Sequence, residues 1–289
     1  MRIAVLGATG KTGRYVVAAL CARGHEVIAI GRSTDRLATL DPRASRALAD
    51  LERPETIGPA LDTAQCVASL AHARFTEIVL ACLPPSCKRV VLTGSLRKLT
   101  RLADPAAEAV RAGEAAFLAA GKPGVMLHPS MIYGAPEDRN VNRILDLIER
   151  VPRWLPLAVP LPDGGRHTVQ PVFVDDMVAA VVAAIERAEV DGTIAVAGPE
   201  AITYREMTST CAAALGRTLI VIPLPAKLLG RLARWASACG LKLPFETAEF
   251  ARAEEDKAFD ISDLREKLGI DPRPFAEGLR LKLARGWRR

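Results

Sequence analysis

The sequence predicts an α/β protein whose main domain is a doubly wound parallel sheet, followed by a smaller C-terminal lobe. The first 130 residues alternate short apolar runs with amphipathic, helix-like stretches. The runs are apolar at successive positions, as in strands that helices cover on both faces of a parallel sheet. Because crossovers between parallel strands are right-handed, the alternation predicts a doubly wound arrangement. The predicted strands are 2–7, 26–31, 45–49, 65–71, 88–94 and 124–129.

The helical stretches between these strands carry recognisable ends. Gly24 and Gly121 each follow a helical pattern, and glycine accepts the left-handed backbone that commonly ends a helix. Asp104 and Pro105 stand where the pattern before Gly121 begins, as an N-cap residue and a proline of the first turn do. We therefore expect a well-defined helix between Asp104 and Gly121.

The composition changes after this first part of the chain. Residues 150–167 are rich in proline and glycine and predict a loop with short extended pieces, whereas 174–188 predict a helix. The C-terminal third has several helical stretches and many prolines. We therefore expect a sheet domain over 1–133, completed by later segments such as 168–198, and a partly helical lobe over 134–289.

Charge and cysteine content exclude several classes of protein. The formal net charge of the 289 residues is only +6, and the single concentrated basic run, 284–289, is typical of a solvated tail, so no nucleic-acid partner is expected. The six cysteines include no C-x-x-C pair and have no histidine at zinc-finger spacing, so we expect reduced thiols, no metal site and a cytoplasmic location. No membrane span and no secretory signal are expected, because long apolar runs are missing and the chain starts directly with a strand.

The stretch LGATGKTG over 6–13 admits two interpretations. The letters GKT suggest the phosphate loop of an NTPase, but that motif requires a glycine at position 5, where the chain has Val5. A glycine-rich turn for a dinucleotide fits better, because a predicted strand precedes it and a predicted helix follows it. Its spacing is G-x-x-G-x-x-G, and the alternative is a structural turn that binds nothing.

Each glycine of such a turn has a physical purpose. One turns the chain, one lets a backbone amide approach a phosphate, and one lets the helix pack close to the sheet. The helix N-terminus then receives the pyrophosphate, and the Lys11 ammonium can add a direct charge. The predicted contacts of this turn with the cofactor are Gly7, Thr9, Gly10, Lys11, Thr12 and Gly13.

The end of the second predicted strand favours NADP(H) over NAD. Binders of NAD usually carry an acid there for the ribose 2′-hydroxyl, but here Gly31 is followed by Arg32. A guanidinium can bind a 2′-phosphate with charge-assisted hydrogen bonds, and Ser33 and Arg36 can assist. The alternative for Arg32 is a solvated loop arginine. Asp50, after the third strand, is placed either to reach the adenine amino group or to cap the next helix.

These motifs, in this order, resemble the short-chain dehydrogenase/reductase superfamily over nearly the whole chain. The likeness is greatest to atypical members of its extended branch: NAD(P)H-binding, NmrA-like and epimerase-like proteins, and the nucleotide-binding accessory subunit of respiratory complex I. The resembling segments are GATGKTG (7–13), ADL (49–51), RVVLTGS (89–95), HPSMIYG (128–134), QPVFVDDMVAAVVAAI (170–185) and EEDKAFDISDLREKLGIDPRPFAEGL (254–279).

The resemblance implies a dinucleotide-binding (Rossmann) domain with a substrate pocket between the two lobes. Further cofactor contacts are expected at Leu51, Leu70, Thr93, Pro129, Ser130 and Met131. Leu96 and Tyr133 are expected to line the substrate pocket, with Tyr133 packed at its edge. Of Asp175 and Asp176, one is expected to be the N-cap of the helix that follows.

The sequence departs from the superfamily in its catalytic residues. The family normally uses a serine and a Tyr-x-x-x-Lys pair, in which the lysine lowers the pKa of the tyrosine. Ser95 matches the serine, but Ala106 and Val110 occupy the positions of the pair, counted back from Glu114. The usual proton relay is therefore missing.

Ser95, Lys98 and His128 remain the candidate catalytic residues. Ser95 can donate a hydrogen bond to a substrate carbonyl. Lys98 can donate a proton if it turns inward, and the alternative is a solvated loop lysine. His128, which replaces the family's common arginine, is a candidate acid near neutral pH, and the alternative is a hydrogen-bonded histidine at a strand end.

The function predicted is an NADP(H)-binding, oxidoreductase-like protein. It would transfer hydride to a small or quinone-like substrate, and a quinone can take its proton from water. One alternative is a non-catalytic NADP(H)-binding redox sensor or assembly protein. Another is an epimerase or dehydratase, although no cluster of Arg or Lys suits a nucleotide-sugar diphosphate. Whether the chain is an enzyme, and its oligomeric state, stay open at this point.

Overall fold

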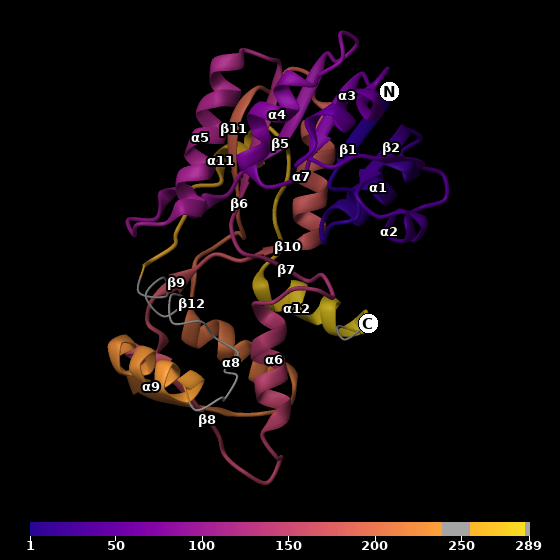
Figure 1. Cartoon of the computed structure of the whole chain (residues 1–289). Coiled ribbons are helices and arrows are strands. Elements are labelled where there is room, and N and C mark those ends of the chain that lie inside the picture. Colours follow the sequence, from indigo (N-terminus) through magenta and orange to yellow (C-terminus); the bar gives the residue numbers. More distant parts are fainter. Residues whose placement is uncertain (239–254, 287–289) are drawn as a thin grey trace. The chain divides into compact units, whose positions relative to one another are not determined.

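The computed structural model describes residues 1–238 and 255–286 (Figure 1). Cys239 and the end of the basic run, 287–289, lie outside the described residues. The chain divides into two compact units. Unit 1 contains 1–130, 174–197 and 260–272. Unit 2 contains 131–173, 198–259 and 273–289.

Unit 1 is built on a seven-stranded parallel sheet, which confirms the predicted fold class. The strand order is β11-β6-β5-β4-β1-β2-β3, so the order reverses between β1 and β4, as in a doubly wound sheet. The strands are β1 Arg2–Leu6, β2 Glu26–Gly31, β3 Ser45–Leu48, β4 Cys66–Ser69, β5 Arg89–Thr93, β6 Gly124–Pro129 and β11 Gly192–Val196. Ligands of such sheets bind outside the carboxyl ends of the strands at this reversal.

Helices cover both faces of this sheet (Figure 1). Helices α1 and α7 pack together on one face, and α4 and α5 pack together on the other. The α-helices of unit 1 are α1 Gly13–Ala22, α2 Thr34–Ala38, α3 Ile57–Leu61, α4 Thr76–Ala81, α5 Pro105–Ala120, α7 Val174–Glu186 and α11 Ser262–Glu266. The short 3-10 helices are η1 Pro54–Thr56, η2 Ala73–Phe75 and η3 Leu96–Leu99.

The ends of α5 follow the sequence signals. The Asp104 carboxylate accepts a hydrogen bond of 3.0 Å from the Ala106 amide, so Asp104 is the N-cap. Gly121 ends the helix in the left-handed conformation, at φ 57°. Apolar side chains are buried on both faces of the sheet. The buried cluster between the sheet and helices α3, α4 and α5 includes Ile57, Leu61, Val67, Val90, Phe117 and Met126.

Unit 2 contains three two-stranded sheets and four α-helices among its described residues. The parallel pairs are β7 Ile132–Tyr133 with β10 Val172–Phe173, and β8 Leu157–Pro162 with β13 Leu219–Leu224; the antiparallel pair is β9 Thr168–Val169 with β12 Ile202–Thr203. The helices are α6 Val141–Arg150, α8 Tyr204–Ala214, α9 Ala226–Ala238 and α12 Phe275–Ala284, with the 3-10 turn η4 Asp163–Gly165. None of the helices that the structure describes is long and apolar enough to cross a bilayer.

Tyr133 lies in the core of unit 2, which corrects the expectation that it packs at the edge of a substrate pocket. Its side chain is fully buried, and its hydroxyl donates a hydrogen bond of 3.1 Å to the Phe275 carbonyl. Its ring contacts Phe173 and Phe275 at centroid distances of 5.4 and 4.9 Å. A Cβ on Gly278 would lie 2.1 Å from the Tyr133 hydroxyl, so α12 can pack here only through a glycine.

Candidate functional site

The glycine-rich turn between β1 and α1 is tight. The Gly10 amide donates a hydrogen bond of 2.9 Å to the Gly7 carbonyl, and Gly7 has a φ of +76°. A Cβ on Gly13 would lie 2.2 Å from the Gly7 oxygen and 2.8 Å from the Ala8 oxygen, which are both backbone atoms. Only glycine fits at position 13, because neither carbonyl can move without displacing the turn.

The N-terminus of α1 is suited to an anion. Helix α1 begins at Gly13, its N-cap Thr12 makes no side-chain capping bond, and its first turn carries no acid. The helix dipole favours negative charge at such an end. A Cβ on Gly7 would contact the Leu70 carbonyl carbon at 3.3 Å, so the turn lies against the end of β4, where Leu70 was predicted to contact the cofactor.

The residues after β2 lie beside this turn. The Arg36 guanidinium donates a hydrogen bond of 2.9 Å to the Thr9 carbonyl, and the Ser33 hydroxyl caps α2 by accepting from the Arg36 amide. Arg32 is exposed at the end of the strand. The structure therefore brings the predicted contacts of the turn and those after β2 to one edge of the sheet. The nearest acid in sequence, Asp35, lies in the first turn of α2.

Asp50 and Leu51 lie after β3. The Asp50 carboxylate accepts a hydrogen bond of 3.1 Å from the Glu52 amide, and the Asp50 amide donates to the Thr56 hydroxyl. The next helix, η1, has Arg53 at its N-cap position, so Asp50 caps a turn and not that helix. Leu51 packs partly buried against the core of unit 1. Contact of Asp50 with adenine stays a prediction.

Thr93 ends β5 with an unpaired hydroxyl. Its Oγ1 is buried and has no hydrogen-bond partner among the described residues. An unsatisfied buried hydroxyl costs free energy, and a bound polar group can remove that cost. Together with the tight turn and the acid-free end of α1, this orphaned atom fits a dinucleotide along the carboxyl edge of the sheet.

His128 holds the loop that carries Ser95. The Ser95 amide donates a hydrogen bond of 3.2 Å to Nδ1 of His128, whose side chain is buried at the end of β6. A Cβ on Gly94 would lie 2.3 Å from that nitrogen, so the glycine permits the close approach of the ring. The Ser95 hydroxyl accepts a hydrogen bond of 3.1 Å from the Arg97 amide. Both candidate residues thus lie together at the carboxyl ends of β5 and β6.

Lys98 turns inward, which corrects its interpretation as a solvated loop lysine. Its ammonium donates to the Glu114 carboxylate of α5 and lies 3.4 Å from Nε2 of His128. The Lys98 side chain is only 18% exposed. The Arg111 guanidinium donates to the Lys98 carbonyl, which fixes the same loop to α5. A lysine, a glutamate and a histidine therefore form one cluster beside Ser95.

His128 is uncharged at neutral pH, so the expectation of a neutral-pH acid was wrong. Burial, followed by the nearby Lys98 ammonium, lowers the pKa of His128 to about 4. Because Nδ1 accepts from the Ser95 amide, the ring proton lies on Nε2, which is 3.3 Å from a Glu114 carboxylate oxygen. The imidazole thus bridges Ser95 and Glu114 in one tautomer.

Helix α5 carries no Tyr–Lys pair. Ala106 is half-buried and Val110 is buried at the two positions, and Glu114 follows one turn after Val110. Glu114 marked only the register of the pair in the sequence, and its contacts with Lys98 and His128 were not predicted. No local signal in the sequence pairs this acid with Lys98 or His128, because the three residues come from elements that meet only in the folded unit.

The remaining predicted residues fall on both units. Ser130 is the last residue of the first segment of unit 1, and Met131 is the first residue of unit 2. The Ser130 amide donates a hydrogen bond of 2.9 Å to the Val196 carbonyl. Asp175 and Asp176 lie inside the first turn of α7, which begins at Val174. The expectation that one of them is the N-cap of this helix was therefore wrong. Carboxylates there interact favourably with the helix dipole. Leu96 is buried at the start of η3. The predicted pocket between the lobes stays a prediction.

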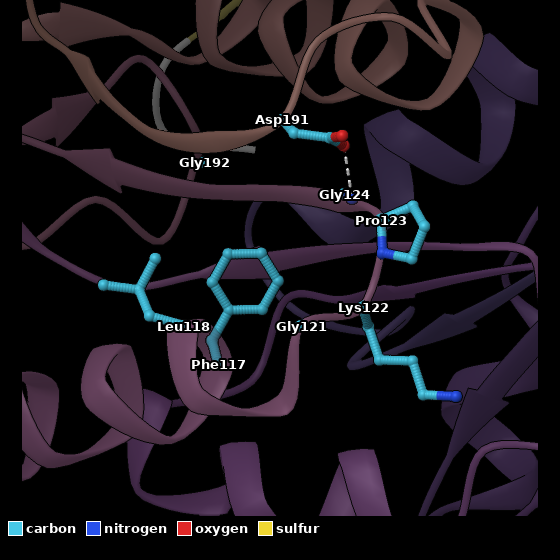
Figure 2. A pocket seen from close by; sticks show the side chains of 8 residues that line it. All are labelled: Phe117, Leu118, Gly121, Lys122, Pro123, Gly124, Asp191 and Gly192. Carbon is cyan, nitrogen blue, oxygen red and sulfur yellow. Dashed lines mark hydrogen bonds between the residues drawn. The ribbon is translucent and has the colours of Figure 1, made fainter.

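A hollow at the opposite edge of the sheet is lined by none of the residues predicted to bind cofactor or substrate. Figure 2 shows it at the starts of β6 and β11, with Asp191 directed at the Gly124 amide. The Asp191 carboxylate accepts a hydrogen bond of 2.6 Å from the Gly124 amide and one of 3.3 Å from the Arg89 guanidinium. Asp191 thus serves the chain's own hydrogen bonds. The candidate site is therefore the carboxyl edge.

Several known proteins are similar to this chain. Residues 7–121 match the model of a family described as NAD(P)H-binding. An uncharacterized protein of Mycobacterium tuberculosis is 27% identical over 96% of this chain and 29% of its own length. The 3-diazoavenalumate denitrifying reductase of a Streptomyces species is 28% identical over 81% of this chain and 88% of its own length. The photosystem II assembly factor Ycf39 of Synechocystis is 33% identical over 27% of this chain and 24% of its own length.

Solved structures share the fold. The UDP-N-acetylglucosamine 4-epimerase of Bacillus cereus has a TM-score of 0.76 and 18% identity, covering 99% of this chain and 100% of its own. The UDP-glucose 4-epimerase of Thermus thermophilus, solved with NAD, has a TM-score of 0.69 and 20% identity, covering 99% of each chain.

The sheet and the glycine-rich turn are those of the doubly wound α/β class, and the turn lies within the part of the chain that matches an NAD(P)H-binding family. Residues 7–121 match the NAD(P)H-binding family, and this match is consistent with the resemblance to the extended, NmrA-like branch of the short-chain dehydrogenase/reductase superfamily. The chain spans 29% of the length of the mycobacterial relative.

Proposed function

We propose that this chain is an NADP(H)-dependent oxidoreductase that transfers hydride to a small or quinone-like acceptor without a Tyr–Lys pair. The bound nicotinamide supplies the hydride. The observation that carries the proposal is the geometry around the turn. The first turn of α1 has no acid, and Gly13 lets the helix start in close contact with the Gly7 and Ala8 carbonyls. The Arg36 guanidinium donates a hydrogen bond to the Thr9 carbonyl of the same turn. The relative named as a reductase, which aligns over most of both chains, supports hydride transfer.

The residues after β2 support a preference for NADP(H). Gly31 leaves no carboxylate at the end of the strand, and a Cβ there would lie 3.2 Å from the Thr9 side chain. Arg32 is exposed beside it, and Arg36 is held against the turn. Two guanidinium groups near a ribose would bind its 2′-phosphate and would gain nothing from a 2′-hydroxyl.

Reversing the charge at Arg32 tests this preference. Arg32→Glu is expected to weaken NADPH binding by at least about tenfold and to change NADH binding little, because a carboxylate repels only the 2′-phosphate. Isothermal titration with both nucleotides measures the two affinities. Arg23→Glu reverses a charge on an exposed arginine after α1 and serves as the matched control. An equal loss for NADPH and NADH would contradict the 2′-phosphate role.

Ser95 and Lys98 are the residues we assign to the acceptor. The Ser95 hydroxyl accepts from the Arg97 amide, so its own proton can be donated to a carbonyl oxygen. The Lys98 ammonium lies in the same loop and is held by Glu114. We assign it the stabilisation of negative charge on the acceptor oxygen, while water supplies the proton. A neutral His128 orients the loop.

Substitution of Lys98 separates this role from cofactor binding. Lys98→Met is expected to lower kcat at least about tenfold, and Lys98→Arg, which keeps a cation beside Glu114, is expected to retain most of it. The assay follows NADPH oxidation with quinones, aldehydes and aromatic diazonium salts. NADPH affinity should stay the same in both variants. Turnover of Lys98→Met equal to that of the unmodified chain would remove Lys98 from the mechanism.

The second candidate function is a non-catalytic NADP(H)-binding redox sensor or assembly protein. Ala106 and Val110 in place of the Tyr–Lys pair favour it, and one relative is named as an assembly factor. NADPH binding without any loss of nicotinamide absorbance across the acceptor panel would select this function. Epimerase activity is the weakest candidate, because it depends on the missing pair and on likeness of fold alone.

A further inference from the structure

The β8–β13 sheet of unit 2 has one buried face and one exposed face. Leu157 and Val159 of β8 are buried, whereas Ala158 and Pro160 between them are exposed. In the parallel register, Ala158 lies opposite Ile220 and Pro160 lies opposite Ile222 of β13. Ile220 is 52% exposed and Ile222 is 42% exposed. The four side chains on the exposed face of the two strands are thus all apolar.

The loop before β8 extends this apolar surface. Trp154 is 80% exposed, and Leu155 next to it is also exposed. The Arg217 guanidinium, just before β13, donates 2.8 Å to the Val151 carbonyl and 2.9 Å to the Leu155 carbonyl. It therefore fixes the loop at the start of the two strands. We name this surface the apolar face; it consists of Trp154, Leu155, Ala158, Pro160, Ile220 and Ile222.

The segments that form and follow the apolar face carry no acid. Residues 150–162 and 215–238 contain neither Asp nor Glu. Their cations are Arg150, Arg153, Arg217, Lys227, Arg231 and Arg234. The chain has 39 Lys and Arg and 33 Asp and Glu, which gives a formal net charge of +6. The six cations of these segments therefore equal the net positive charge of the whole chain.

Five of the six cations are exposed. Arg217 is occupied by backbone carbonyls, but Arg150, Arg153, Lys227, Arg231 and Arg234 are exposed. Helix α9, which carries the last three, follows β13 directly and contacts β8. An exposed tryptophan and two isoleucines thus lie next to five exposed cations, and the acids nearest in sequence, Glu149 and Asp163, flank these segments.

We propose that the apolar face docks on the surface of an anionic lipid bilayer. Tryptophan favours the headgroup level, the isoleucines can enter the acyl boundary, and the surrounding arginines and lysine attract anionic headgroups. A symmetric second copy fits less well, because it would bring the same cations together without acids to pair them. A nucleic acid fits less well, because the exposed tryptophan and isoleucines would stay in contact with a polar sugar-phosphate backbone and the strand positions of the face present no polar side chain for bases.

The proposal is tested with the full chain and lipid vesicles. Cosedimentation compares phosphatidylcholine vesicles with vesicles that mix phosphatidylcholine and anionic phosphatidylglycerol. We expect binding to the anionic vesicles, weakening as salt rises, and a blue shift of tryptophan fluorescence that Trp154→Phe removes. The double variant Trp154→Ser/Ile220→Ser is expected to bind the anionic vesicles at least about tenfold more weakly. Leu118→Ser, at a leucine of unit 1 that is 57% exposed, is the matched control and should bind normally.

The charge contribution has its own variant. Arg153→Gln is expected to weaken vesicle binding by about fivefold, because the variant loses one positive charge near the membrane surface. NADPH affinity and the melting temperature of each variant report whether the chain is folded. Absence of sedimentation at low salt, or equal binding by the double variant, would overturn the proposal. So would a dimer that the double variant dissociates without lipid, or displacement of the vesicles by a DNA duplex.

Discussion

Gly13→Ala is expected to weaken the binding of NADPH and of NADH by at least about 100-fold, the largest effect that we predict for a single substitution. The added Cβ would lie 2.2 Å from the Gly7 carbonyl oxygen and 2.8 Å from the Ala8 carbonyl oxygen. Both contacts are with backbone of the turn itself, so relief requires α1 to move away from β1. That movement displaces the helix N-terminus on which the pyrophosphate depends.

Titration calorimetry with each nucleotide measures the loss, and a thermal melt without nucleotide reports the strain. Gly58→Ala is the matched control, because Gly58 lies in α3 and a Cβ there would meet no atom within 4 Å. Nucleotide binding by Gly58→Ala should equal that of the unmodified chain. Normal affinity in Gly13→Ala would mean that the turn does not hold the dinucleotide, and the proposed function would fail with it.

The strands and the turn could be predicted because their signals are local. Strands buried on both faces must be apolar at successive positions, and 124–129 was predicted with the bounds that β6 has. Asp104 and Gly121 marked the ends of α5, because capping involves neighbouring amides and the backbone of one residue. The second unit was harder. Residues 150–167 predicted a loop with extended pieces, yet they contain β8, whose single paired edge tolerates prolines.

Contacts between distant residues could not be predicted. Lys98 and Glu114 are both common charged residues, and nothing local shows that a lysine three residues after Ser95 turns inward to meet α5. Lys282 is a second example, since a lysine on an amphipathic helix is expected in solvent. Here its ammonium is fully buried, donates 3.0 Å to the Ala135 carbonyl and lies 4.0 Å from the Asp138 carboxylate. Tertiary packing alone decides both positions.

The stability of the chain is expected to fall as pH drops from above 6.5 toward 4, because of His128. Its pKa is about 4 in the folded chain and has its ordinary value of 6.5 in the unfolded chain. Between these values the unfolded chain binds a proton that the folded chain does not, so acid favours unfolding. At 1.36 kcal/mol for each pH unit, the loss in the free energy of unfolding is on the order of 3 kcal/mol below pH 4.

Urea unfolding at a series of pH values measures this loss in the free energy of unfolding. The variant His128→Asn separates the contribution of His128 from that of carboxylates that titrate in the same pH range. The asparagine carbonyl can take the place of Nδ1 and accept from the Ser95 amide, but it does not titrate. The variant should therefore lose about 2 to 3 kcal/mol less than the unmodified chain between pH 7.5 and 4.5.

The same protonation should release Ser95. A charged His128 has no lone pair on Nδ1, so the Ser95 amide loses its acceptor and the loop that carries Ser95 and Lys98 loses one of its anchors to β6. Amide hydrogen exchange at Ser95 should accelerate as pH approaches 4 beyond the intrinsic trend, and it should not do so in His128→Asn. If the two chains lost stability in parallel with pH, the buried imidazole would not be the titrating group and its role in holding Ser95 would have to be abandoned.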